Sequence, residues 1–144
     1  MRCLIVSDIH GNLPALEAVL ATPQARGCTR VFSLGDHTGF GPQPRQVQLR
    51  LSALGAVLLE GNHESRLRHV DEPEFSGYNW TLLRWTAKQL TGLSTAFPRD
   101  FRLGDVLMTH GTPGDPFHLI GEKEVPGVLA ALPEGCRFLL SGHN

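Results

Sequence analysis

The chain has 144 residues, the size of one ordinary domain and long enough to bury a hydrophobic core. Apolar residues make up 41% of it and charged residues 19%, a composition typical of globular proteins, so we expect a single domain over residues 1–144. The net charge is −1 and the basic residues are scattered, so we do not expect the protein to bind duplex nucleic acid or a membrane surface.

Short apolar runs alternate with segments of helical periodicity along the chain. Asn12 is placed to cap the first helix, and Pro14 is tolerated in its first turn. Strands that alternate with helices predict an α/β fold. The predicted elements are, in chain order, a strand at 3–6, a helix at 13–20, a strand at 31–34, a helix at 44–54, a strand at 56–59, a loop at 71–77, a helix at 80–93, a hairpin of strands at 101–103 and 106–109, a helix at 125–132 and a strand at 138–141.

The compartment follows from the cysteines and from the length of the apolar runs. Three cysteines, far apart and without zinc-knuckle spacing, indicate a reducing compartment. The apolar run at 3–6 is too short for a signal peptide, and no stretch approaches the ~20 apolar residues of a membrane span. We therefore expect a cytoplasmic protein with no membrane partner.

Polar side chains beside glycines follow each predicted strand. In open α/β sheets, ligands bind beyond the carboxyl ends of the strands, so these segments are expected to converge on one site. Glycine lets the backbone turn sharply there and frees the neighbouring side chains to point inward. The segments are Asp8-Ile9-His10-Gly11-Asn12, Gly35-Asp36, Gly61-Asn62-His63-Glu64, His110-Gly111 and Gly142-His143.

These side chains suit a centre of two metal ions. Asp8 and His10, separated by one residue, would face the same way on an extended backbone and could hold one ion, while Asp36 could bridge two. Asn62 offers an amide oxygen, and His110 and His143 offer imidazole nitrogens. Mixed nitrogen and oxygen ligation favours Mn, Fe, Zn, Co or Ni over Ca or Mg. Two such ions ~3.5–4 Å apart can drive an in-line phosphoryl displacement by a hydroxide.

In this order, the segments resemble the motifs of the calcineurin-like metallophosphoesterase superfamily. The sequences of Ser7–Asn12 and of Gly39-Phe40-Gly41-Pro42 are similar to those of the small bacterial phosphodiesterase branch of this superfamily. The resemblance implies a four-layer α/β/β/α sandwich and a cofactor of two divalent transition-metal ions, with manganese as the first choice. It assigns Asp8, His10 and Asp36 to the first metal, Asp36, Asn62, His110 and His143 to the second, and to His63 the role of an uncoordinated proton donor.

Two departures from the family pattern matter. The last motif of the family is Gly-His-x-His, and here Asn144 follows His143, so we expect a domain that is truncated in its C-terminal part and that by itself is weakly active or inactive. An incomplete sheet would favour association with a second copy. Protein phosphatases of the superfamily carry arginines where Phe40 and Glu60 stand, so the resemblance does not favour that branch.

The pattern leaves three functions open. The first is a phosphodiesterase with some phosphomonoesterase activity on a small phosphate ester. The second is a hydrolase of dinucleoside polyphosphates, and the third is a non-catalytic scaffold with a phosphoesterase fold. Outside the motif positions, we interpret Glu64 as a support of the ligands, His37 as a solvated loop residue, and His69 and His118 as surface residues.

Overall fold

A computed structural model describes residues 1–72 and 78–143, without the side chains of residues 78 and 79. Its first sheet is parallel, with strands β1 (Cys3–Val6), β2 (Arg30–Ser33) and β3 (Val57–Leu58) in that order. In the second sheet, β4 (Asp100–Leu103) is antiparallel to β5 (Val106–Thr109), which is parallel to β6 (Phe138–Ser141).

The two sheets are joined by an apolar core. Phe32 and Leu34 from the first sheet meet Met108 from the second, and all three are buried. Leu59 belongs to the same cluster, and partly buried side chains of both sheets pack around it. This contact brings the strand ends of the two sheets, and the segments that follow them, close together.

Helices α1 (Leu13–Leu20) and α3 (Pro44–Ala53) cover the other face of the first sheet. They share a buried cluster with β3 that includes Leu16, Val47 and Leu51. Asn12 caps α1 as expected, because its side-chain oxygen accepts a hydrogen bond from the Ala15 amide at 3.1 Å. The short helix α2 (Pro23–Arg26) follows in the same layer.

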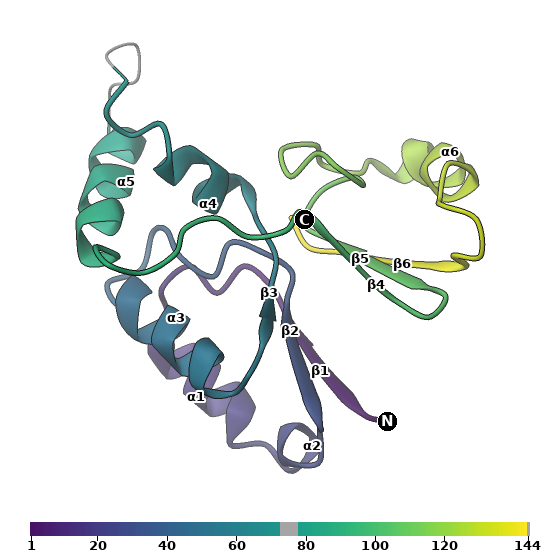
Figure 1. Cartoon of the computed structure of the whole chain (residues 1–144), viewed down its shortest axis with the longest axis horizontal. Helices are drawn as coiled ribbons and strands as arrows, with labels where there is room; N and C mark the ends of the chain where they lie inside the picture. The colour runs from purple at the N-terminus through teal and green to yellow at the C-terminus, as the bar shows by residue number, and fades with distance from the viewer. Residues whose placement is uncertain (73–77, 144) are drawn as a thin grey trace.

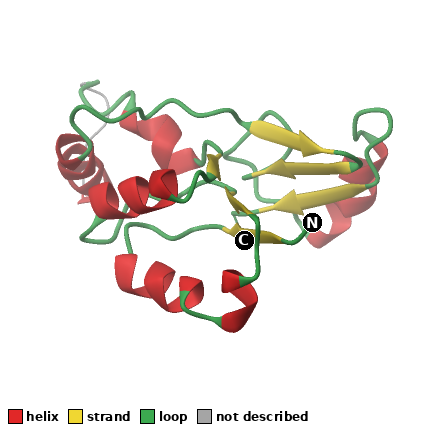
Figure 2. Ribbon diagram, turned by 60° about the horizontal axis from the view of Figure 1, so that its bottom comes forward, coloured by secondary structure: helices red, strands yellow, loops and turns green. Residues whose placement is uncertain are grey.

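The remaining helices lie beside the sheets. Helices α4 (Asn62–Leu67) and α5 (Tyr78–Gln89) pack on each other through a separate apolar cluster. The 3₁₀ turn η1 (Glu122–Glu124) leads into α6 (Val125–Ala130), beside the outer face of the second sheet (Figure 1). The order of layers is therefore helices, sheet, sheet and helix, which confirms the predicted four-layer sandwich (Figure 2).

Some predicted boundaries were wrong. The predicted helix at 80–93 occupies 78–89, and the one at 125–132 ends at Ala130, because Pro133 disfavours the helical conformation of Leu132. Helices α2 and α4 were not predicted. The predicted loop at 71–77 lies outside the described residues from position 73 onward. Among the helices of the described part, none has the length and apolar character needed to cross a membrane.

Candidate metal centre

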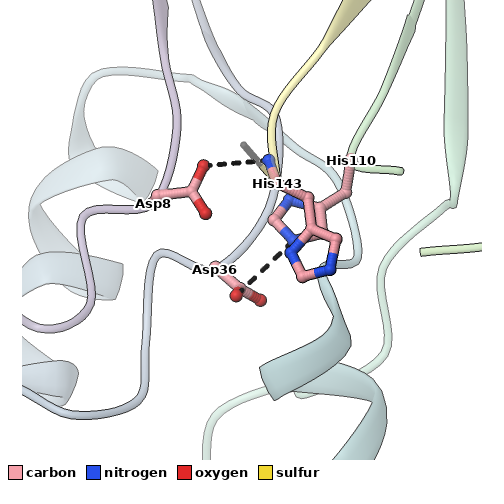
Figure 3. Close-up of side chains that lie close together, drawn as sticks. All are labelled: Asp8, Asp36, His110 and His143. Atoms are coloured by element: carbon pink, nitrogen blue, oxygen red, sulfur yellow. Dashed lines mark hydrogen bonds and ion pairs between the residues drawn. The ribbon is translucent and has the colours of Figure 1, made fainter. Parts of the chain in front are cut away.

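The segments that follow the strands meet at one place between the two sheets. Asp8 and Asp36 come from the loops after β1 and β2, and His110 and His143 from the ends of β5 and β6 (Figure 3). One ligand atom from each of these four side chains lies within 4.8 Å of those of the other three. Residues far apart in the sequence thus form one compact polar cluster.

Asp36 lies at the middle of the cluster. Its Oδ2 atom lies 3.5 Å from Nε2 of His110, 3.8 Å from Nε2 of His10 and 3.9 Å from Nε2 of His63. Burial raises the pKa of the Asp36 carboxyl, but the interaction with His110 and the charges of His63 and His110 outweigh it, so the pKa is lowered. The carboxylate form that a metal requires is therefore favoured.

A second group shares Asp36. It joins His10 and His63, whose ligand atoms lie within 4.8 Å of each other and of the Asp36 carboxylate. The family assignment pairs Asp8 with His10, whereas the geometry groups Asp8 with His110 and His143. Asp36 is common to both groups, which is the position that a bridging carboxylate takes in a two-metal site.

Two histidines are held in the tautomer that a metal needs. Nδ1 of His110 lies 2.9 Å from the Leu34 carbonyl oxygen, and Nδ1 of His10 lies 3.2 Å from that of Thr38. An N–H at Nδ1 donates to each carbonyl, which leaves the lone pair of Nε2 directed at Asp36. Burial lowers the pKa of His110, but Asp36 and Asp8 outweigh it and raise the pKa, so a proton competes with a cation there.

The amide of Asn62 provides a test of whether a cation fits. Its Oδ1 position lies 3.0 Å from Asp36 Oδ2, 3.1 Å from His110 Nε2 and 3.2 Å from His143 Nδ1. An amide oxygen that faces three lone-pair atoms is unfavourable by itself and becomes favourable when a cation lies among them. If the Asn62 amide group were rotated by half a turn, its nitrogen would donate hydrogen bonds to these three atoms and its oxygen would accept one from Arg66. The donor set therefore fits a transition-metal ion.

The backbone at the centre is unusual. Asp8, His10, Asp36 and His143 are the non-glycine residues with positive φ in the described chain, at values from 47° to 54°. This left-handed conformation is uncommon outside glycine and costs roughly 1–2 kcal/mol per residue. All four are candidate ligands, so the strained positions coincide with the polar cluster.

Glu64 holds the loop that carries Asp36. It is fully buried, and its Oε2 accepts hydrogen bonds from the amides of Asp36 at 2.8 Å and Gly61 at 3.0 Å. Its Oε1 accepts from the Thr38 amide at 2.9 Å and from the Thr38 hydroxyl at 2.7 Å. With four donors satisfied, Glu64 supports the ligand loop and does not face the metal groups, in keeping with the supporting role expected from the sequence.

Two glycines permit the close approach of the loops. A side chain at Gly61 would collide with Asp36, and one at Gly142 would meet Ser7 and would lie 3.2 Å from Asp8 Oδ2. Only hydrogen fits at these positions. Gly142 lies against the first sheet's ligand loop, so it sets the spacing between the two halves of the centre.

The rings of His63 and His10, both in the second group, lie beside the ring of Phe40. The ring centroids of His63 and His10 are 4.8 Å apart, and that of Phe40 lies 4.5 Å from His63 and 5.1 Å from His10. Burial lowers the pKa of His63, and this outweighs the opposite effect of the Asp36 carboxylate. Nδ1 of His63 has no hydrogen-bond partner among the described residues.

The other histidines lie away from both groups. His37 is fully buried, so the prediction of a solvated loop histidine was wrong. Its ring packs on Phe97 at 4.9 Å, and its Nδ1 lies 3.6 Å from Glu64 Oε1. His69 and His118 are exposed as predicted and pair with Glu72 and Glu124.

Sequence reasoning missed one side chain at the centre. The Ser7 hydroxyl donates to Asp8 Oδ2 at 2.5 Å, and the His143 amide donates to the same oxygen at 3.3 Å. Both bonds fix the Asp8 carboxylate. The position of Ser7, directly before a candidate ligand at a strand end, was the available signal.

The chain resembles several known proteins. It is 29% identical over 121 residues to an uncharacterised protein of Methanocaldococcus jannaschii, an alignment that covers 78% of this chain and 50% of the relative. The crystal structure of a metallophosphoesterase from Sphaerobacter thermophilus matches 99% of this chain and 60% of its own, with a TM-score of 0.81 and 29% identity. A structure of a candidate diadenosine tetraphosphatase matches 85% of this chain and 56% of its own, with a TM-score of 0.53 and 27% identity.

The chain thus spans between half and about three fifths of the length of these relatives. The family model for calcineurin-like phosphoesterases matches residues 1–143. That range contains both candidate metal groups and the loops that support them. The chain belongs to the calcineurin-like phosphoesterase family.

Proposed function

We propose that the protein is a two-metal hydrolase of small phosphate esters, most active as a phosphodiesterase and less so as a phosphomonoesterase. The observation that carries this proposal is the position of Asp36, whose Oδ2 lies within 3.9 Å of the Nε2 atoms of three histidines. These histidines come from the loop after β1, from α4 and from the end of β5. A carboxylate shared by two groups of nitrogen and oxygen ligands is suited to two divalent ions.

The proposed ligands follow the family motifs. Asp8, His10 and Asp36 would hold the first ion, and Asp36, Asn62, His110 and His143 the second. Manganese is the first choice, with Fe, Zn, Ni and Co as alternatives. When bound by these residues, two such ions would supply a hydroxide nucleophile and would stabilise the charge that develops on the phosphoryl oxygens.

His63 is proposed as the proton donor to the leaving oxygen. Its Nε2 faces the same carboxylate as the candidate ligands, at 3.9 Å, while the Asp36 carboxylate accepts a hydrogen bond from the His63 amide at 2.9 Å. This hydrogen bond from the backbone amide of His63 keeps the imidazole at the edge of the centre, beside the place where a leaving group would depart.

Turnover of bis-p-nitrophenyl phosphate tests the proposal. The full-length gene product is purified, stripped of metal, reloaded separately with Mn²⁺, Ni²⁺, Co²⁺ or Zn²⁺, and assayed beside Asp36→Asn. We expect hydrolysis with at least Mn²⁺, slower hydrolysis of p-nitrophenyl phosphate, and loss of both activities in the variant. Absence of turnover with all four metals would contradict the proposal.

A second candidate is hydrolysis of a dinucleoside polyphosphate. The similarity to a structure named as a candidate diadenosine tetraphosphatase favours it. The same ions would serve this reaction, so the centre alone does not separate the two. A panel of aryl diesters, cyclic nucleotides and diadenosine polyphosphates separates them by the ratio of their kcat/KM values.

A non-catalytic scaffold is the third candidate. The four candidate ligands with positive φ argue against it, because a scaffold without catalytic activity has no need of such strained positions. Two equivalents of bound metal with no turnover of any substrate in the panel would favour the scaffold.

A further inference from the structure

A groove of about 500 Å³ opens directly from the candidate metal centre. Asp8 and His10 form one side of it, and Phe40, Pro42 and Gln43 form another. A phosphate ester held at the metal centre would therefore extend one of its ester groups into this groove. The chemistry of the groove determines which group that is.

Phe40 is the main apolar surface of the groove. Its side chain is 52% exposed, yet its ring packs on His63 at 4.5 Å and on His10 at 5.1 Å. A single exposed phenylalanine is common and needs no explanation. This one differs because it covers the proposed proton donor and a candidate ligand while keeping a free face toward the groove.

The loop that carries Phe40 is fixed on both sides. The carbonyl of Gly39 accepts a hydrogen bond from the Thr86 hydroxyl at 3.1 Å, and the Gly41 amide donates to the His10 carbonyl at 2.6 Å. The Gln43 amide donates to the Gly11 carbonyl at 3.1 Å. The ring is thus held in place before a ligand arrives, which reduces the entropy lost on binding.

The polar groups of the groove are neutral away from the metal side. Asn12 and Gln43 offer amides, Pro14 and Pro42 add apolar surface, and the lining, which lies wholly within the described residues, contains no lysine or arginine. A second phosphate would require cations there. A flat aromatic ring instead stacks on phenylalanine, and amides pair with the heteroatoms of such a ring.

We propose that Phe40 and this groove form the subsite for the leaving group, and that they select phosphate esters of an aromatic or heteroaromatic alcohol or of a nucleoside. The proposal rests on the proposed function, because it places the leaving oxygen beside His63. It assigns specificity to the loop between β2 and α3.

Binding of phosphonates to the Mn²⁺-loaded protein by calorimetry tests this assignment. We expect phenylphosphonate to bind about 5- to 150-fold more tightly than methylphosphonate, as stacking of one ring predicts. In Phe40→Ala this ratio should fall to near one, while methylphosphonate binding is retained. Phe40→Tyr should restore the ratio, and Phe138→Ala, with a side chain of similar exposure (51%) outside the groove, should not change it.

The outcomes separate this inference from the proposed function. Equal affinities for the two phosphonates, or a preference that survives in both Phe40→Ala and Phe40→Leu, would overturn the subsite. Failure of both phosphonates to bind would overturn the metal centre as well. Adenosine 5′-monophosphate distinguishes a nucleoside from a simple aryl group as the natural ligand of the subsite. If it binds more tightly than phenylphosphonate, and this advantage is lost in Phe40→Ala, the ligand is a nucleoside. If it binds more weakly than phenylphosphonate, the ligand is a simple aryl group.

Discussion

His63 belongs to the second candidate metal group, and its ring packs on Phe40, which lines the groove. Its role is therefore the sharpest question at the scale of single residues. If it donates a proton and binds no metal, His63→Ala should keep the metal content of the wild type. Turnover should fall by a factor on the order of 10²–10⁴, the usual contribution of a general acid. Metal analysis beside steady-state kinetics measures both quantities.

His110→Ala is the matched control for that experiment. His110 is fully buried and its Nε2 lies 3.5 Å from Asp36 Oδ2, so its loss should lower metal content and turnover together. If His63→Ala also loses metal, the grouping of His63 with His10 and Asp36 reflects ligation, and the proton donor is another residue.

The polar residues of the centre could be predicted, but their conformations could not. Asp8 and His10 were predicted to grip one ion from an extended backbone, whereas both have positive φ. Hydrogen bonds from the Asp8 and His10 amides to the Gly35 and Asp36 carbonyls hold this geometry. Such bonds depend on the neighbouring loop, which no local pattern encodes. His37 was misassigned for the same reason.

At the scale of elements, Glu64 couples the first turn of α4 to the loop after β2. Glu64→Gln replaces one accepting oxygen by an amide group that meets N–H donors. We expect unfolding free energy to fall by about 1–3 kcal/mol and metal affinity to fall by roughly 10- to 100-fold. Urea unfolding and metal titration measure these effects. Glu122→Gln, at an exposed position in η1, should change neither the unfolding free energy nor the metal affinity. Equal effects of the two substitutions would refute the role of Glu64.

Glu60 links two elements through a buried carboxylate. It pairs with Arg68, which follows α4, and with Nε of Arg99 at 3.2 Å, just before β4. Burial raises the pKa of Glu60, but the bonds and charges of the two arginines outweigh it and lower the pKa. A lowered pKa means that Glu60 stabilises the fold above its unfolded-state pKa, and that this contribution disappears as pH falls through the folded-state pKa.

Glu60→Gln should therefore lower the unfolding free energy by about 1–3 kcal/mol at neutral pH. The difference from the wild type should shrink as the pH is lowered, because the protonated carboxyl pairs no better than the amide. Denaturant unfolding over a pH series checks both statements. A difference that stays constant down to acidic pH would show that packing, and not charge, is responsible.

Most elements could be predicted from periodicity, and the misses have local causes. Helix α4 begins at Asn62, inside a segment interpreted only as ligands, although Glu64 stands three residues after Gly61 and accepts a hydrogen bond from its amide, as the glutamate of a capping box does. Strand β3 is shorter than predicted because only Val57 and Leu58 pair with β2. Pairing is a tertiary property, so composition does not fix its extent.

At the scale of the whole molecule, the convergence of five segments was predictable from the rule for strand ends. The contact of the two sheets was implied by the family resemblance alone, because it depends on tertiary packing. The part of the molecule formed by β6, α6 and the segment before η1 carries exposed apolar side chains, including Phe138, Leu129 and Leu119. Val125 and Leu129 line a cavity of about 330 Å³ beside β6, which pairs with β5 alone among the described residues. Such a face favours association.

We therefore predict that the chain self-associates through this face. Sedimentation velocity should show dimers or larger species that increase with concentration. Leu129→Lys should shift the distribution toward monomer, whereas Val19→Lys, at an exposed position of α1, should not. A monomer at every concentration would refute the prediction.

The left-handed backbone conformation of the four candidate ligands lowers the stability of the metal-free protein while it positions side chains for metal binding. Replacing His10 by glycine removes the steric cost of a positive φ, roughly 1–2 kcal/mol, and at the same time removes a candidate ligand. A selection for heat resistance without metal would accumulate such substitutions and erase the centre. Engineering of this protein for robustness should therefore hold these four positions fixed and be carried out with the metal present.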